Sequence, residues 1–166
     1  MSAVTNAYRK VVDELRAGTF RPVYLLHGEE GFFMDRLATE IEGAAVAEHE
    51  RDFNHTVLYA RDAGPDQVKD ACLRYPMMAE RQVVVLREAQ VWRIDDLEKL
   101  VPYFLKPTPT TVLIICYKHK KVDGRRKVLK SVQDGKGTVF LSDKVKEEEL
   151  PALLTGLAKR QDRKLG

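Results

Sequence analysis

Nine residues from Gly28 to Arg36, with the sequence GEEGFFMDR, stand where a phosphate-binding loop would stand, between an apolar strand and a helix. In such a loop, GxxxxGK followed by Ser or Thr, backbone N–H groups cradle the phosphates, the Lys binds them and the hydroxyl binds magnesium. Aligned on Gly28, the three functional positions hold Phe33, Met34 and Asp35. The chain therefore has the position of a nucleotide site without the groups that would bind ATP.

The magnesium half of a nucleotide site is missing as well. An Asp would be expected after the apolar strand 82–87, yet the strand ends in Arg87 followed by Glu88. A guanidinium about 4 Å from a divalent ion would be repelled by roughly 8 kcal/mol at an effective dielectric of about 20. We therefore predict no ATP hydrolysis and no cofactor, even if Gly28 merely turns the chain of an unrelated α/β fold.

A different class of chemistry could use the acidic residues at the strand ends. Glu29, Glu30 and Glu88 could hold a divalent metal in a phosphoryl-transfer enzyme. Arg87 and a basic segment crowd the same edge, and no attacking group is evident. The metal-dependent enzyme is therefore the weaker alternative.

Composition favours one globular domain. The chain has 166 residues, of which 44% are hydrophobic and 32% charged, enough for a real core. Its apolar stretches are too short to cross a membrane and its N-terminus lacks a signal-type segment, so we expect a cytoplasmic protein without a membrane partner. The four scattered histidines do not form a metal-ligand pattern, so no metal site is predicted. Cys72 and Cys116 have the spacing of neither a disulfide framework nor a zinc site, and we predict two buried thiols.

Strands and helices alternate along the chain. Strands are expected at 23–27, 56–60, 82–87, 111–117 and 138–141, and helices at 8–15, 33–44, 66–73, 95–106 and 126–132. Apolar residues at consecutive strand positions indicate a sheet buried on both faces. We predict a doubly wound, mostly parallel five-stranded sheet with helices on both faces and functional loops at the carboxyl ends of the strands.

The domain boundary is expected near residue 142. Residues 1–142 would form the α/β domain, and 143–166 the start of a helical second domain that is apparently truncated. The amphipathic run there fits a C-terminal helix docked on the sheet equally well.

The turn before the third strand reads YPMMAERQ, from Tyr75 to Gln82. Pro76 cannot continue the preceding helix. Met77 and Met78 are adjacent and cannot both face one core, so at least one should be exposed, and a flexible thioether suits a partner groove. The open alternative is that Met77 packs under the turn while Met78 covers the sheet edge.

A basic segment, residues 118–130, follows the fourth strand. Its seven basic residues are Lys118, Lys120, Lys121, Arg125, Arg126, Lys127 and Lys130. Asp123 is its single acidic residue. The basic residues could contact DNA phosphates. Because no aromatic residue is interleaved for base stacking, a solvated helix start is the favoured interpretation. An arginine finger from Arg125 or Arg126, acting on a neighbour's ATP, is a third alternative.

Several segments share their pattern with one family. They are PVYLLHGEE at 22–30, LEKLVPYF at 97–104, TTVLII at 110–115 and KVDGRRK at 121–127, together with P-x-x-A-x-R at 76–81. In this order they resemble the bacterial DNA polymerase III delta subunit, the clamp-loader wrench. The resemblance implies an AAA+-like domain whose nucleotide site is degenerate at Gly28, Phe33, Met34, Asp35 and Arg87. It also implies a non-catalytic subunit of a polymerase holoenzyme whose polymerase activity lies in another subunit.

The same resemblance implies the partners. The family inserts an apolar pair into a hydrophobic pocket of the ring-shaped sliding clamp, the beta subunit, and opens it. Here those positions are Met77 and Met78, flanked by Tyr75, where the family often has Leu and Phe. Further partners implied are the gamma/tau and delta prime subunits of the clamp loader, and DNA through the assembled complex.

Overall fold

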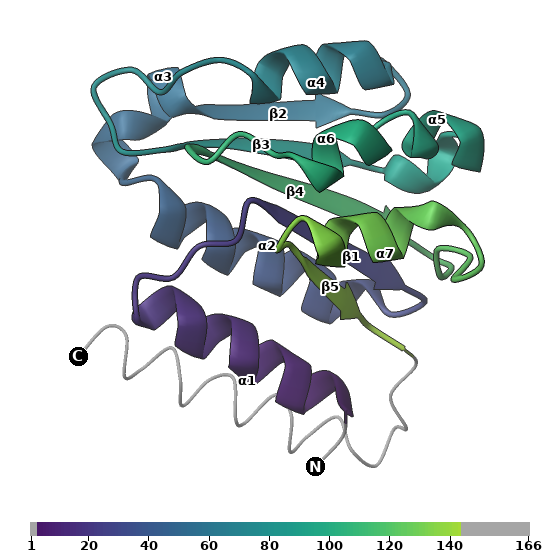
Figure 1. Cartoon of the computed structure of the whole chain (residues 1–166). Helices are drawn as coiled ribbons and strands as arrows, with labels where there is room; N and C mark the ends of the chain where they lie inside the picture. The colour runs from purple at the N-terminus through teal and green to yellow at the C-terminus, as the bar shows by residue number, and fades with distance from the viewer. Residues whose placement is uncertain (1–2, 144–166) are drawn as a thin grey trace.

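The computed structural model describes residues 3–143 and shows an open parallel sheet with helices on both faces (Figure 1). The strands are β1(Val23–Gly28), β2(His55–Tyr59), β3(Gln82–Arg87), β4(Thr111–Lys118) and β5(Thr138–Leu141). The helices are α1(Ala3–Arg16), α2(Gly31–Ala45), α3(Arg51–Asn54), α4(Pro65–Cys72), α5(Ile94–Glu98), α6(Val101–Leu105) and α7(Lys127–Asp134), with short 3-10 turns η1(Glu48–Glu50) and η2(Ala89–Val91). The start of a helical second domain, expected beyond Asp143, lies outside the described residues.

The strand order is β2-β3-β4-β1-β5, and every neighbouring pair is parallel. From β1 the chain crosses to the far edge at β2, returns through β3 and β4, and then places β5 on the other side of β1. The order therefore reverses at β1, and the carboxyl end of β1 is the switch point where doubly wound sheets place ligands. In the register of this sheet Gly28 lies opposite Lys118, so the turn after β1 and the basic segment are neighbours.

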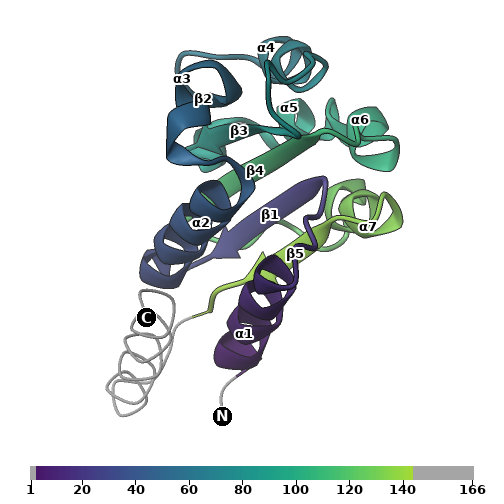
Figure 2. The same cartoon turned by 90° about the vertical axis from the view of Figure 1, so that its left-hand side faces the viewer.

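Two apolar clusters fill the two faces of the sheet. Tyr24 and Leu26 of β1 belong to the cluster under α1 and α2, whereas Val23 and Leu25 belong to the cluster under α4 to α7. Figure 2 shows α1 and α2 on one side of the sheet and α6 and α7 on the other. Cys72 and Cys116 are both buried free thiols, as predicted. The predicted doubly wound fold is confirmed.

One predicted helix is wrong. The continuous helix expected at 95–106 is broken into α5 and α6, with Pro102 in the first turn of α6. Proline lacks the N–H that would bond back to the carbonyl four residues earlier, and its ring clashes with that carbonyl, so the helix restarts. The apolar stripe survives the break because Leu97, Leu100 and Phe104 all remain buried.

No helix among residues 3–143 has the length and apolar character needed to span a bilayer.

Candidate functional site

The two predicted functional regions lie at opposite edges of the sheet. Residues 73–81, called here the methionine loop, precede β3 and therefore lie at the amino edge. Gly28, Arg87 and Lys118 end their strands and therefore lie at the carboxyl edge. In Figure 1 the segment that joins α4 to β3 passes beside α3, at the end of the sheet away from the strand arrowheads. The two regions are therefore separated by the length of the strands.

The methionine loop presents its apolar side chains to solvent. Tyr75 is 84% exposed, Met77 59% and Met78 100%. The alternative in which Met77 packs under the turn and Met78 covers the sheet edge is therefore wrong. Leu73 in the same loop is half-exposed, and Phe53 of α3 is 72% exposed. Large apolar side chains exposed together mark an interaction surface more often than isolated ones do.

A buried asparagine fixes the backbone of the methionine loop. The side-chain amide of Asn54 donates to the carbonyl oxygen of Met77 at 2.9 Å, and its oxygen accepts the N–H of Met77 at 2.6 Å. The same amide nitrogen donates to the carbonyl oxygen of Glu50 at 3.0 Å. This paired bonding mimics a strand partner, so α3 and the loop are held as one unit.

The two ends of the loop are held by β3 and its neighbours. The Gln82 amide donates to the carbonyl oxygen of Arg74 at 2.7 Å and to that of Ala71 at 3.1 Å, which satisfies carbonyls at the end of α4. At the other end, the Arg81 guanidinium lies 4.0 Å from the centre of the Phe20 ring. The loop is exposed in its side chains but fixed in its backbone.

Met78 adopts a left-handed conformation with φ of 54°. For a residue other than glycine this conformation costs about 1–2 kcal/mol, and such strain clusters at functional sites. The rest of the loop must hold Met78 in this conformation, in which its side chain is fully exposed to solvent.

We expect Asn54→Ala to release the loop. The substitution leaves the Met77 N–H and carbonyl without their partner, so the free energy of unfolding should fall by about 1–3 kcal/mol. Trypsin should then cleave after the exposed Arg74, at the start of the loop, faster than in the parent chain. Asn6→Ala, at an exposed position of α1, is the matched control and should change stability by less than about 0.5 kcal/mol in urea unfolding. Equal cleavage rates for both variants would show that Asn54 does not hold the loop.

The sequence reasoning missed the three residues that support this surface. Phe53 and Asn54 lie in a stretch without helical or strand periodicity, so nothing in the pattern connected them to residues 23 positions later. Gln82 carried a usable signal, because a polar residue opening an otherwise apolar buried strand needs hydrogen-bond partners.

At the carboxyl edge, backbone N–H groups of the turn after β1 donate hydrogen bonds to carbonyl oxygens elsewhere in the chain. Gly28 donates its N–H to the Lys120 carbonyl oxygen at 3.2 Å, and Glu30 donates its N–H to the Ser142 carbonyl oxygen at 3.1 Å. Phe33 and Met34 are buried in the core under α1 and α2. The Asp35 carboxylate forms an ion pair with the Lys118 ammonium at 2.6 Å.

A histidine in β1 bonds the basic segment beside the same turn. His27 is buried, and its Nδ1 accepts the N–H of Val122 at 2.9 Å. Burial lowers the pKa of His27 to about 4, so the ring is neutral at pH 7 and can accept this bond. The imidazole thereby ties β1 to the basic segment.

The glutamates proposed as a metal site have other partners. Glu30 caps α2, since its Oε1 accepts the N–H of Phe32 at 2.8 Å, and Glu88 accepts a hydrogen bond from the Gln90 amide. Within residues 3–143 no group of three or more acidic, His or Cys side chains is placed to hold a metal ion. The alternative of a metal site built from Glu29, Glu30 and Glu88 is therefore not favoured.

Most of the basic segment is neutralised by acidic side chains. Lys118 pairs with Asp35, Lys121 with Asp143, Arg125 with Asp123, and Arg126 with both Asp95 and Glu98. The Lys120 ammonium lies 5.8 Å from the centre of the Tyr117 ring, and Lys127 is an exposed residue at the start of α7. The Arg126 pairs fasten the segment to α5. Four of the six residues predicted to contact phosphate are thus ion-paired with acidic side chains of the protein itself.

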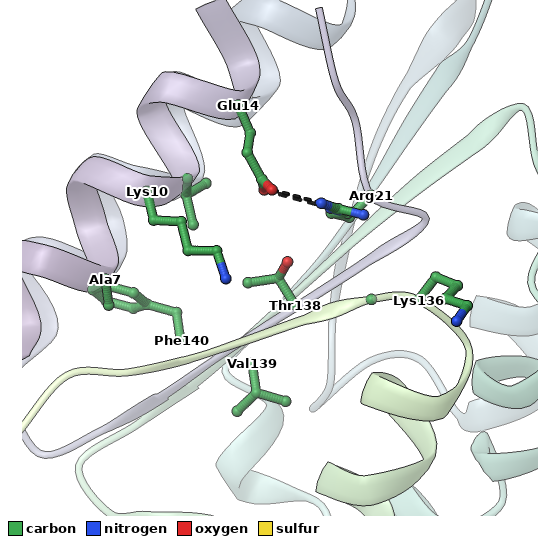
Figure 3. A pocket seen from close by; sticks show the side chains of 10 residues that line it. Ala7, Lys10, Glu14, Arg21, Lys136, Thr138, Val139 and Phe140 are labelled. Carbon is green, nitrogen blue, oxygen red and sulfur yellow. Dashed lines mark hydrogen bonds and ion pairs between the residues drawn. The ribbon is translucent and has the colours of Figure 1, made fainter. Parts of the chain in front are cut away.

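A shallow cavity of about 360 Å³ lies away from both regions, between α1 and β5 (Figure 3). Glu14 and Arg21 on its rim form an ion pair at 2.6 Å, and Lys10 extends from α1 toward Thr138. This ion pair neutralises the charge of Arg21. None of the residues singled out from the sequence lines this cavity.

Comparisons with known proteins give one consistent result. The family model described as DNA polymerase III, delta subunit, matches residues 24–141. The DNA polymerase III subunit delta of Bacillus subtilis is 25% identical over 162 residues, which are 92% of this chain and 46% of that protein. Among solved structures, the DNA clamp loader delta protein of Bacillus subtilis superposes with a TM-score of 0.77 at 22% identity, covering 93% of this chain and 48% of that one. A DNA polymerase III gamma subunit-related protein of Thermotoga maritima gives a TM-score of 0.55 at 11% identity, over 85% and 47%. The chain spans about half the length of these relatives.

Proposed function

Because this chain belongs to the family of DNA polymerase III delta subunits, we propose that its α/β domain binds the ring-shaped sliding clamp and opens it without hydrolysing ATP. The observation that carries the proposal is the full exposure of Met78, beside Met77, on a loop whose backbone Asn54 fixes. A preformed loop loses little conformational entropy on binding, so the burial of its side chains contributes mainly to affinity. Calorimetric titration of this chain with the sliding clamp of the same organism tests the proposal, and no detectable binding would contradict it.

The proposed docking surface consists of Phe53, Leu73, Tyr75, Met77 and Met78. Burying one methionine in an apolar pocket contributes roughly 1.5–3 kcal/mol, enough to make each a hot spot. Tyr75 in the same loop, and Phe53 next to the Asn54 that bonds Met77, would exclude water around the pair. Methionine in place of the family's Leu and Phe keeps the apolar character and adapts to the same pocket.

The nucleotide site is proposed to be non-functional. The hydrogen bonds that engage the N–H groups of Gly28 and Glu30 support this, because a phosphate would need those donors. The ion pair of Asp35 with Lys118 supports it as well, since Lys118 is a cation next to the turn and is already neutralised. Gly28, Phe33, Met34, Asp35 and Arg87 then have structural roles only.

We expect neither ATP nor magnesium to stabilise this chain. A ligand present at a hundred times its Kd would add about 2.7 kcal/mol to the free energy of unfolding, which is a shift of several degrees in Tm. Thermal unfolding with millimolar magnesium, ATP or both should instead leave Tm within about one degree. A rise with ATP would contradict the degenerate site, and a rise with magnesium alone would restore the metal-dependent alternative.

The remaining partners are proposals that follow from the family. We infer that the carboxyl edge of the sheet is available to the gamma/tau and delta prime subunits when the methionine loop holds the clamp, because the two surfaces lie at opposite edges. Lys120 and Lys127, with no ion pair among the described residues, are the cations best placed to contact DNA in the assembled complex. A cytoplasmic location accords with a replication role.

A further inference from the structure

Among residues 3–143, the exposed methionines lie together in the methionine loop. The protein has four methionines, and Met1 lies outside the described residues. Met34 is completely buried in the core between α2 and the sheet, whereas Met77 and Met78 are exposed. The solvent-accessible thioethers of residues 3–143 are therefore both at the proposed docking surface.

The two thiols are poor competitors for an oxidant. Cys72 and Cys116 are both buried, and burial raises the pKa of each to about 12. Because the thiolate is the reactive form, an uncharged and inaccessible thiol reacts slowly with peroxide. Among the sulfur atoms of residues 3–143, an oxidant therefore reacts first with those of the methionine loop.

The chemistry needs only a peroxide as the second reactant. The thioether sulfur attacks one oxygen of hydrogen peroxide, an S–O bond forms, the O–O bond breaks and water leaves. Sulfur loses two electrons and the peroxide gains them. The product, methionine sulfoxide, is polar and chiral, and sulfoxide reductases can return it to the thioether.

We propose that Met77 and Met78 form a reversible oxidation site that controls docking of this chain on an apolar pocket of the sliding clamp. The proposal rests on the proposed clamp-binding function. A sulfoxide oxygen placed in an apolar pocket loses its hydrogen bonds to water without gaining a partner, so the oxidised loop binds poorly. The free chain tolerates the same change, because Met78 contacts solvent and the loop is held through the backbone of Met77 rather than through its side chain.

The first test measures where oxygen is added. The full chain is treated with graded hydrogen peroxide, digested and mapped by mass spectrometry over time. We expect Met77 and Met78 to gain one oxygen each at least about tenfold faster than Met34, with Cys72 and Cys116 unmodified. Oxidation of Met34 or of either thiol at a comparable rate in the folded chain would overturn the oxidation site.

The second test measures docking after oxidation. Affinity for the sliding clamp should fall at least about tenfold in the treated chain and return after incubation with sulfoxide reductases A and B. The control is Met77→Leu/Met78→Leu, which keeps volume and apolar character without oxidisable sulfur and should bind equally before and after treatment. Unchanged affinity of a fully oxidised parent chain would overturn the control of docking. If the untreated chain does not bind the clamp, the proposed function fails, and the mapping still decides whether the oxidation site exists.

Discussion

The double substitution Met77→Ser/Met78→Ser should weaken binding of this chain to the sliding clamp by at least about a hundredfold. Each methionine buried in an apolar pocket contributes roughly 1.5–3 kcal/mol, so loss of both removes about 3 kcal/mol or more, and each 1.4 kcal/mol corresponds to a factor of ten. The loss should occur without unfolding, because both side chains are exposed in the free chain and contribute little to its core.

Calorimetry with the clamp measures this effect, and urea unfolding of the same variant establishes that the fold is retained. Val91→Ser is the matched control, since Val91 is also exposed but follows β3 at the opposite edge of the sheet. The control should bind the clamp as the parent chain does. A double variant that still binds with parental affinity would remove the methionine loop from the docking site, and equal losses in both variants would point to a nonspecific effect.

The sheet could be predicted from the sequence because its strands are buried on both faces. A run such as Val83 to Leu86 has apolar residues at consecutive positions, which few structures other than a covered parallel strand permit. Strand limits were within a residue or two for the same reason. The sequence wrongly predicts one helix at 95–106 because the apolar stripe is continuous across Pro102, and such a stripe indicates burial rather than unbroken hydrogen bonding.

The site was only half predictable. Met77 and Met78 could be singled out because two adjacent large apolar residues after a proline cannot share one core. The support from Asn54 and the exposure of Phe53 depend on a contact between positions 23 residues apart, which periodicity does not record. The ion pairs of the basic segment could not be predicted for a similar reason, because three of its acidic partners, Asp35, Asp95 and Glu98, lie far away in the sequence.

A large loss of stability is expected from Gly28→Ala. Gly28 has φ of +134°, and a Cβ built there would lie 2.0 Å from the carbonyl oxygen of Ser142. Both atoms of this clash belong to the backbone or are fixed to it, so no flexible side chain can move away. Backbone strain of about 1–2 kcal/mol and overpacking of about 1–3 kcal/mol together predict a loss of roughly 2–5 kcal/mol. Tm should fall by about 5–15 °C.

Two other glycines separate the contributions. Gly18 has φ of +80°, and a Cβ added to it would meet nothing within 4 Å, so Gly18→Ala tests backbone strain alone and should cost about 1 kcal/mol. Gly124 has neither a positive φ nor a close neighbour, so Gly124→Ala should be neutral or slightly stabilising. Urea unfolding of the three variants without any nucleotide decides why Gly28 is a glycine. If its purpose were to let phosphate approach, Gly28→Ala would cost no more than Gly18→Ala in the nucleotide-free chain. A role in packing against Ser142 requires instead that Gly28→Ala be the most destabilising of the three.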